Sequence, residues 1–315
     1  MAFRVFIDGQ AGTTGLQILS RLSWRDDIEL ISIEDSDRKN SARRAQCYAD
    51  ADLVILCLPD KASIEALEEL ADAKTKILDA SSAFRIHPDW VYGLPELSSS
   101  QQALIRTSYR VANPGCYATG YILSVQPLIQ AKLIGVETPL SVQGLSGYSG
   151  GGKQAIQQWE NSCLPTQPYA LTLDHKHLPE MLRYSGSNVA PLFSPAIANY
   201  HAGMIVQIPL AHEVCSTQFS REAVYDVWCE HYQDSPFITV HAPNDKSALD
   251  DGRLSPTARN NTNYLDLFVF GNSDQSILLA RFDNLGKGAS GAAVQNLNLM
   301  LGLEQTLGLE HTNDS

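Results

Sequence analysis

Cys116 has a sequence context that favours nucleophilic chemistry. It follows Pro114 and Gly115 and precedes the segment YATGYILSVQPLIQ, whose apolar spacing predicts a helix up to Pro127. Unpaired N–H groups and the dipole at a helix start stabilise a thiolate, which lowers the pKa of the thiol. A lone cysteine is more often a small buried hydrophobe, and we interpret Cys57, in an apolar strand pattern, in that way. Cys116 is therefore the candidate nucleophile.

A nucleophile needs a group that moves protons, and the stretch LDHKHLPEM supplies three candidates. His175 and His177 lie on a predicted short loop before a helix, and Glu180 follows His177 by three residues, so these two can share a face. Alternate histidines also suit zinc, but no third strong ligand stands at a recognisable spacing. We expect acid/base chemistry at this loop and no metal.

Glycines near the N-terminus suggest a nucleotide site. Gly9, Gly12 and Gly15 have the spacing G-x-x-G-x-x-G, a variant of the dinucleotide fingerprint, between a predicted strand and a predicted helix. Backbone N–H groups at the helix start, with Thr13 and Thr14, can face a pyrophosphate where the dipole favours negative charge. The alternative is a tight turn whose glycines serve packing alone.

The loop after the second predicted strand, IEDSDRKN, bears on the choice of cofactor. A plain NAD site has one acidic residue there, whereas this loop continues to Ser36, Arg38 and Lys39. A hydroxyl and two cations suit a 2′-phosphate, so we expect NADP. The alternative is a solvated loop of mixed charge.

The elements that position these residues indicate two domains. Strand patterns at 4–9, 28–34, 52–59 and 76–81 alternate with helical ones, including a helix capped by Asp60, and predict a Rossmann-type parallel sheet. Later strand patterns follow one another with few helices, which predicts a second α+β domain on a mixed or antiparallel sheet. We expect a dinucleotide-binding domain at 1–115 plus 286–315 and a catalytic and oligomerisation domain at 116–285. The later patterns are strands at 139–145, 203–211, 263–272 and 276–284, and helices at 220–232 and 291–305.

Composition narrows the class of protein. The 315 residues carry a formal net charge of −12, which opposes binding to nucleic acid, and no apolar run is long enough for a membrane helix. The six cysteines form no C-x-x-C pair or regular framework, and the N-terminus has no secretory pattern. We expect a cytoplasmic protein that acts on a small molecule.

Seven motifs follow one another along nearly the whole chain. They are the glycine turn at 9–15, DASSAFR at 79–85, YGLPEL at 92–97, NPGCYAT at 113–119, GLSGYSGGGK at 144–153, HKHLPE at 175–180 and NLGKGASGAAVQNLNLM at 284–300. In this order they resemble the N-acetyl-gamma-glutamyl-phosphate reductases, arginine-biosynthesis enzymes similar in plan to the aspartate-semialdehyde dehydrogenases, and look like the compact branch of that family. In this chain SSAFR and SGYSGGGK replace the family's SADFR and SGxSGAGR, so Lys153 stands where the family has arginine.

The resemblance implies a cysteine thioester mechanism that reduces N-acetyl-glutamyl 5-phosphate to N-acetyl-glutamate 5-semialdehyde with NADPH.

 In that mechanism Cys116 is the nucleophile, and His177 is the acid/base, with His175 less certain and Glu180 in support. A homodimer or homotetramer is expected. The predicted substrate-binding residues are Ser82, Arg85, Asn113 and Lys153, and the cofactor residues beyond the two loops above are Ser146, Gly147, Asn284, Lys287 and Gly288.

Three other functions remain open on the residues alone. An aspartate-semialdehyde dehydrogenase would use the same chemistry on a shorter substrate, although HKHLPE and YGLPEL argue against it. A cysteine-dependent acyl hydrolase needs a thiol and a histidine but no dinucleotide, so a nucleotide at the glycine turn excludes it. A nucleotide-binding regulatory protein would need no reactive thiol. For Lys287 and Asn284 there is also a purely structural alternative, in which they belong to a glycine-rich segment that precedes a surface helix and contacts no ligand.

Overall fold

The chain forms two compact units in a computed structural model that describes residues 2–38, 40–70, 75–162 and 164–309. The described residues of unit 1 fall within Met1–Pro95, Ser99–Pro114 and Ala289–His311. Those of unit 2 fall within Glu96–Ser98 and Gly115–Gly288. The C-terminal helix therefore belongs to the unit that the N-terminal part of the chain begins.

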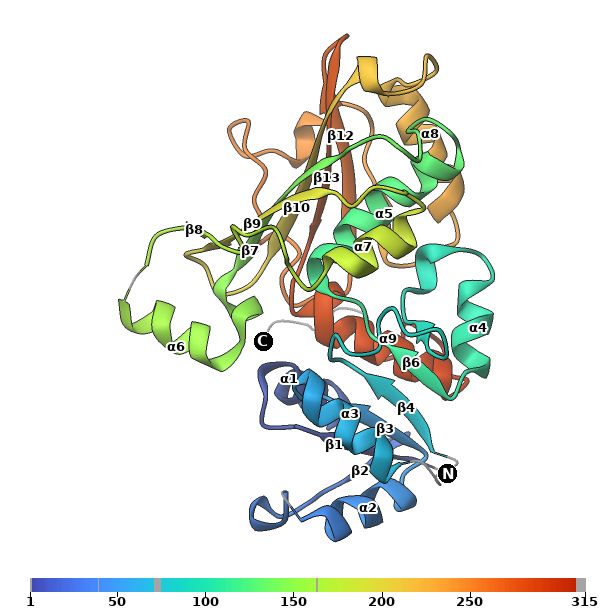
Figure 1. Cartoon of the computed structure of the whole chain (residues 1–315), viewed down its shortest axis with the longest axis vertical. Helices are drawn as coiled ribbons and strands as arrows, with labels where there is room; N and C mark the ends of the chain where they lie inside the picture. Colours follow the sequence, from blue (N-terminus) through green and yellow to red (C-terminus); the bar gives the residue numbers. More distant parts are fainter. Residues whose placement is uncertain (1, 39, 71–74, 163, 310–315) are drawn as a thin grey trace. The chain divides into compact units, whose positions relative to one another are not determined.

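Unit 1 is built on a six-stranded parallel sheet in the order β2-β1-β3-β4-β6-β5 (Figure 1). The strand order reverses between β1 and β3, which is where doubly wound sheets bind ligands outside the carboxyl ends of their strands. The predicted Rossmann-type sheet is confirmed. The strands are β1 (Phe3–Asp8), β2 (Ile28–Ile31), β3 (Leu53–Leu56), β4 (Lys76–Asp79), β5 (Val91–Tyr92) and β6 (Arg110–Ala112).

Helices cover both faces of this sheet because its strands are apolar on both sides. The alternate residues Phe6, Val54 and Leu56 share one core cluster with Tyr48 and Ala66 of two helices, α2 and α3. On the sheet, α1 contacts β1 and α9 contacts β4, and α1 and α9 also contact each other. The helices are α1 (Thr13–Leu22), α2 (Ser41–Asp50), α3 (Asp60–Glu69), α4 (Gln101–Thr107) and α9 (Gly291–Met300), with the short 3-10 turn η1 (Asp35–Asp37). A second 3-10 turn, η2 (Pro95–Leu97), begins in unit 1, and its last two residues belong to unit 2.

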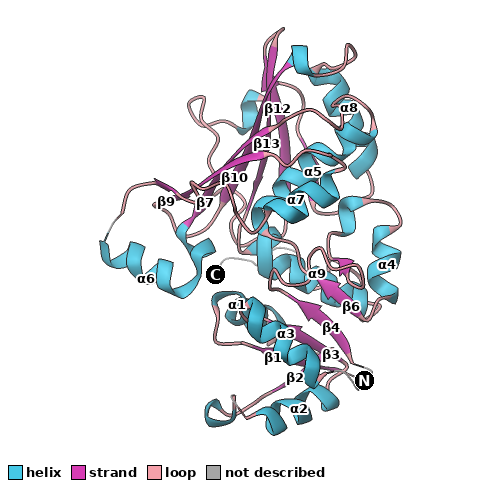
Figure 2. Cartoon of the chain, viewed as in Figure 1, coloured by secondary structure: helices cyan, strands magenta, loops and turns pink. Residues whose placement is uncertain are grey.

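Unit 2 is built on a mixed seven-stranded sheet in the order β11-β12-β13-β10-β7-β9-β8 (Figure 2). Its centre is antiparallel, from β12 through β13 and β10 to β7, and the outer pairs β11 with β12 and β7 with β9 are parallel. The expected mixed sheet is confirmed. The strands are β7 (Ser141–Gly147), β8 (Gln167–Pro168), β9 (Leu192–Ala198), β10 (Met204–Ala211), β11 (Ile238–Val240), β12 (Leu265–Gly271) and β13 (Gln275–Phe282).

The long helix α5 (Cys116–Gln130) packs on strands β10 and β13 and lies beside two further helices, α7 and α8 (Figure 1). The rest of unit 2 consists of α6 (Gly152–Ser162), α7 (Leu178–Ser185), α8 (Arg221–Tyr232), the 3-10 turns η3 (Tyr148–Gly151), η4 (His212–Val214) and η5 (Lys246–Ala248), and the π-helical turn η6 (Gly286–Ser290).

The predicted end of this helix at Pro127 is wrong, because the helix continues to Gln130. Proline has no N–H to donate to the carbonyl four residues earlier, which is that of Leu123. The Tyr232 hydroxyl donates to the Leu123 carbonyl at 2.6 Å instead. A neighbouring helix thus satisfies the acceptor that proline leaves open, and the helix runs on.

One other local prediction is also wrong, and one long strand was not predicted. Asp60 begins α3 but makes no side-chain cap, because its carboxylate accepts hydrogen bonds from the N–H and hydroxyl of Ser82. The strand at Leu192–Ala198 was not predicted, since Pro195 interrupts its pattern, yet it pairs along its length with β7. None of the described helices is long and apolar enough to cross a membrane.

Candidate active site

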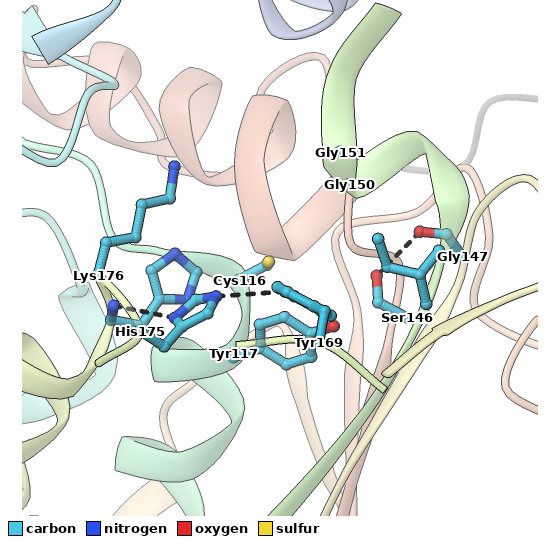
Figure 3. Close-up of a pocket in the computed structure, with 11 residues that line it drawn as sticks. Cys116, Tyr117, Ser146, Gly147, Gly150, Gly151, Tyr169, His175 and Lys176 are labelled. Atoms are coloured by element: carbon cyan, nitrogen blue, oxygen red, sulfur yellow. Dashed lines mark hydrogen bonds between the residues drawn. The ribbon is translucent and has the colours of Figure 1, made fainter. Parts of the chain in front are cut away.

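A cavity of about 230 Å³ in unit 2 brings Cys116 together with the histidine loop (Figure 3). Its wall comes from the start of α5, the end of β7 with the turn after it, and the segment before α7. The described residues that line it are Cys116, Tyr117, Ser146, Gly147, Gly150, Gly151, Tyr169, His175, Lys176, His177 and Ile197.

Cys116 is the first residue of α5, as the sequence predicts. The residue before it, Gly115, is the N-cap, and its backbone N–H donates to Oε2 of the buried Glu180 at 3.0 Å. On the other side of the thiol-bearing residue lies Gly288, where an added Cβ would be only 2.8 Å from the Cβ of Cys116. Glu180 and Gly288 thus fix the backbone around the candidate nucleophile.

Hydrogen bonds at the histidine loop assign different positions to its two histidines. Nδ1 of His175 accepts from the backbone N–H of His177 at 3.1 Å, and its Nε2 lies 3.2 Å from the Tyr169 hydroxyl. A ring nitrogen that accepts carries no proton, so a neutral His175 has its proton on Nε2 and donates it to Tyr169. His177 is buried at the N-cap of α7 and lines the same cavity.

Two tyrosines complete the floor of the cavity and were not predicted as site residues. Burial raises the pKa of Tyr117 and of Tyr169 well above the ordinary value, so both phenols keep their protons. The ring of Tyr117 packs edge-on against that of His175, with ring centres 5.8 Å apart. Tyr117 lies in the motif NPGCYAT directly after the cysteine, but no role was predicted for it, and Tyr169 lies outside every motif, before the histidine loop.

Lys176 is the cation that sequence analysis overlooked. It is exposed, lines the cavity, and extends from the backbone between the two histidines (Figure 3). The sequence feature that could have identified Lys176 is its position between the two histidines of the HKH motif. By contrast, Lys153 is exposed on α6 and does not line this cavity.

The turn after β7 carries two residues predicted to contact the cofactor, Ser146 and Gly147, and both line the cavity. The side chain of Asn284 braces this region, because Nδ2 donates to the Ser149 hydroxyl at 3.0 Å and Oδ1 accepts from the Gly203 N–H at 2.8 Å. The Asn284 amide thus has two partners inside unit 2, and its predicted contact with the nicotinamide stays a prediction.

Lys287, which the sequence predicts to contact the cofactor, has a partner within unit 2. Its ammonium is fully buried and lies 2.7 Å from Oε1 of Glu96. Burial lowers the pKa of Lys287, and the Glu96 carboxylate opposes that effect. The structure gives this ammonium a buried carboxylate as a partner, and its contact with the cofactor stays a prediction.

In unit 1 the glycine turn has the close backbone approaches that a dinucleotide site requires. Gly9 has φ +84°, and a Cβ there would lie 2.4 Å from the Cys57 carbonyl oxygen. A Cβ at Gly15 would lie 2.6 Å from the Gly9 carbonyl oxygen, while Gly12 is the N-cap of α1. The Thr13 hydroxyl is buried in the first turn of α1 and has no hydrogen-bond partner among the described residues. A helix start with an unsatisfied donor fits a phosphate.

The remaining cofactor residues of unit 1 lie around this turn and after β2. Thr14 is the second residue of α1 and is half-buried. Ser36 is exposed in η1, and the half-buried Arg38 follows it. The predicted contact of Lys39 lies outside the described residues.

The predicted substrate residues of unit 1 form two separate groups. The buried Arg85 donates through Nε to the Asn113 carbonyl at 3.0 Å, and the Asn113 amide donates to the Ala289 carbonyl at 3.0 Å. Ser82 instead bonds to Asp60 of α3. Among the described residues no group of three or more metal-ligating side chains occurs.

Comparisons with known proteins agree with this architecture. Residues 4–105 match the family model "Semialdehyde dehydrogenase, NAD binding domain", and residues 116–284 match "Semialdehyde dehydrogenase, dimerisation domain". Among solved structures, aspartate semialdehyde dehydrogenase II from Vibrio cholerae is similar in fold, with a TM-score of 0.73 and 16% identity over 96% of this chain and 99% of that one. The enzyme from Candida albicans, solved with NADP, has a TM-score of 0.67 and 12% identity over 96% of this chain and 99% of that one.

Curated relatives are much closer in sequence. The chain is 46% identical to N-acetyl-gamma-glutamyl-phosphate reductase 2 of Nostoc sp., over 97% of this chain and 99% of the relative. It is 45% identical to the N-acetyl-gamma-glutamyl-phosphate reductase of Brucella ovis, over 95% of this chain and 99% of that protein. With such identity over nearly the full length, the chain belongs to the N-acetyl-gamma-glutamyl-phosphate reductase family.

Proposed function

We propose that this protein reduces N-acetyl-glutamyl 5-phosphate to N-acetyl-glutamate 5-semialdehyde and phosphate, through a thioester on Cys116. The observation that carries the proposal is the cavity in which Cys116, at the start of α5, meets the histidine loop. A helix start stabilises a thiolate, and an acyl phosphate is already activated toward attack. No metal is required for this chemistry.

The thiolate sulfur of Cys116 attacks the acyl carbon and forms a C–S bond. The bond from that carbon to the phosphate oxygen breaks, and phosphate leaves with its electron pair. Bound NADPH supplies the hydride that reduces the thioester carbon. His177 donates a proton to the carbonyl oxygen and takes it back when the C–S bond breaks, which releases the aldehyde and regenerates the thiolate.

Hydrogen bonding supports the choice of His177 over His175 as the acid/base. The ring of His175 accepts at Nδ1 from the His177 N–H and contacts Tyr169 at Nε2, so both of its nitrogens have a positional role. His175 orients the loop, and His177 moves the proton. Positioned proton transfer contributes about 10²–10⁴ in rate.

The substrate is an anion in a protein of net charge −12, so local cations must hold it. Lys176 lines the same cavity as Cys116 and supplies a positive charge there. We assign it a contact with the phosphate or carboxylate of the substrate. Arg85, with Asn113, is the corresponding candidate of unit 1.

The cofactor is NADP. The turn of Gly9, Gly12 and Gly15 holds its pyrophosphate, with the Thr13 hydroxyl as an additional donor. Ser36 and Arg38 contact the 2′-phosphate. The match to a dimerisation domain supports a homodimer or homotetramer, and the cysteine pattern supports a cytoplasmic location.

The test is phosphate-dependent reduction of NADP with N-acetyl-glutamate semialdehyde, run beside aspartate semialdehyde. We expect turnover of the acetylated substrate only. Cys116→Ala should abolish it, whereas the matched control Cys215→Ala, in the same unit but outside the cavity, should not. Activity with aspartate semialdehyde alone, or full activity of Cys116→Ala, would refute the proposal.

Two further variants test the assigned roles. His177→Asn should lower kcat by about 10²–10⁴ with little change in NADPH affinity, and His175→Asn should lower it less. Lys176→Met should raise the KM for the semialdehyde and for phosphate more than that for NADP. The reverse ranking of the histidines would move proton transfer to His175.

A further inference from the structure

The buried ion pair between Lys287 and Glu96 has no part in the chemistry proposed above. Side-chain exposure is 0% for Lys287 and 2% for Glu96, and Nζ lies 2.7 Å from Oε1. The ammonium also lies 5.7 Å from the centre of the Phe237 ring. Removing two charges from water costs several kcal/mol per ion, and an apolar pair of similar volume is often as stable. Stability alone therefore does not account for this pair.

The lysine belongs to a turn that contacts the candidate nucleophile. A Cβ at the next residue, Gly288, would lie 2.8 Å from the Cβ and 3.4 Å from the Cα of Cys116. A Cβ at the preceding residue, Gly286, would lie 2.0 Å from the Thr262 carbonyl oxygen. The backbone on both sides of Lys287 is therefore closely packed. Gly286 packs against Thr262, and Gly288 packs against Cys116.

The backbone of Glu96 is held as well, through its carbonyl group. Nε2 of His231, on α8, lies 3.1 Å from the Glu96 carbonyl oxygen. Burial lowers the pKa of His231, so its ring is neutral at pH 7 and donates its Nε2 proton to that carbonyl. On the same helix, Trp228 donates to the Ser124 carbonyl of α5 at 3.1 Å. Glu96 is thus anchored to a helix that is itself anchored to the helix of Cys116.

We infer that Lys287 and Glu96 are positioning residues, whose directional ion pair sets the place of the Gly288 backbone against Cys116 and so the position of the thiol. This inference rests on the proposed function in taking Cys116 as the nucleophile. An apolar pair would fill the same space but would have no preferred direction. A displacement of 1 Å at a catalytic group can cost about 10²-fold in rate.

The experiment compares Lys287→Met, the double variant Lys287→Met with Glu96→Leu, and a stability control. The control is Arg281→Met, which breaks another buried ion pair of unit 2, with Asp266 at 2.6 Å, outside the cavity. Each variant is measured for its Tm, its kcat and KM values, and the pH profile of Cys116 alkylation by iodoacetamide, followed by mass spectrometry. All assays run at the same interval below each Tm.

We expect the double variant to recover most of the Tm that Lys287→Met loses, because no charge is left unpaired. Its kcat should nevertheless fall about 10- to 100-fold, with the KM for NADPH unchanged and the alkylation profile shifted. Arg281→Met should lose Tm and keep the wild-type alkylation profile. If the double variant does not fold, the single variant Lys287→Met is measured in its place, and we expect the same fall in kcat and the same shift of the alkylation profile.

A folded variant lacking the pair, with wild-type kcat and a wild-type alkylation profile, would overturn the inference and leave the pair a structural contact. Failure of the proposed function is distinguishable, since it would appear as a wild-type protein without reductase activity. Alkylation needs neither substrate nor cofactor, so it decides the positioning role in either case.

Discussion

Replacing Gly288 by alanine probes the contact on which the position of Cys116 depends. The new Cβ would lie 2.8 Å from the Cβ of Cys116 and 3.2 Å from the Asp283 carbonyl oxygen. Carbon atoms pack best at about 3.5–4.0 Å, so the two Cβ atoms must separate by about 0.7–1.2 Å. Neither side is the end of a flexible side chain. The turn, or the first residue of α5, has to move.

The size of this displacement sets the expected losses in stability and in kcat. Overpacking of this kind costs about 1–3 kcal/mol of stability, and a shift near 1 Å at the nucleophile lowers kcat about 10²-fold. Because the clash is with Cys116, the alkylation rate of the thiol should also change in the absence of cofactor. The KM for NADPH should stay close to that of the wild type.

The assay is steady-state kinetics with iodoacetamide labelling and thermal unfolding on the same samples. The matched control is Gly135→Ala, whose Cβ would meet only the Thr138 hydroxyl, at 3.1 Å, in an exposed turn. We expect the control to keep its kcat. A folded Gly288→Ala variant with kcat within twofold of the wild type, or with its loss confined to the KM for NADPH, would refute the reasoning.

Two further predictions concern stability. Tyr232→Phe should lower the free energy of unfolding by about 1–3 kcal/mol, since the Leu123 carbonyl loses its donor, and Pro127→Ala in that background should restore part of the loss in urea denaturation. His241 Nδ1 lies 3.1 Å from Oδ2 of Asp245, and its Nε2 forms an ion pair with Asp266 at 3.4 Å. Burial lowers the pKa of His241, but the two carboxylates more than offset this effect, so the pKa is raised. The stability it confers is present below its unfolded pKa, near 6.5, and is lost as pH rises through the higher folded value. His241→Gln should therefore flatten the fall in Tm above that pH; an unchanged slope would rule this contribution out.

Local patterns were enough to predict the βα units of unit 1 and the helix that starts at Cys116. Each of these elements depends on hydrophobic periodicity and on turn residues only a few positions away, such as Gly9 before α1 and Gly115 before α5. The fold class follows from the alternation of strands and helices. These features require no knowledge of distant contacts.

Features that depend on distant partners could not be predicted in this way. The passage of α5 through Pro127 needs a hydroxyl more than 100 residues away, on Tyr232. The pairing of Lys287 with Glu96 joins residues 191 apart, and no local pattern around either residue indicates it. Lys153 matched a family motif by position, but the structure places Lys176, from a different motif, at the cavity. Sequence patterns thus identified candidate residue types, whereas tertiary packing determines which of these residues line the cavity.

The central claim is that Cys116 carries the acyl group as a thioester. The direct measurement is intact and peptide mass spectrometry after incubation with N-acetyl-glutamate semialdehyde and NADP in the absence of phosphate, where no phosphate is present to release the acyl group. We predict an N-acetyl-glutamyl adduct on the peptide that contains Cys116, lost when phosphate is added and absent from Cys116→Ala. An active enzyme that forms no adduct under these conditions, or forms it on a different residue, would contradict the account.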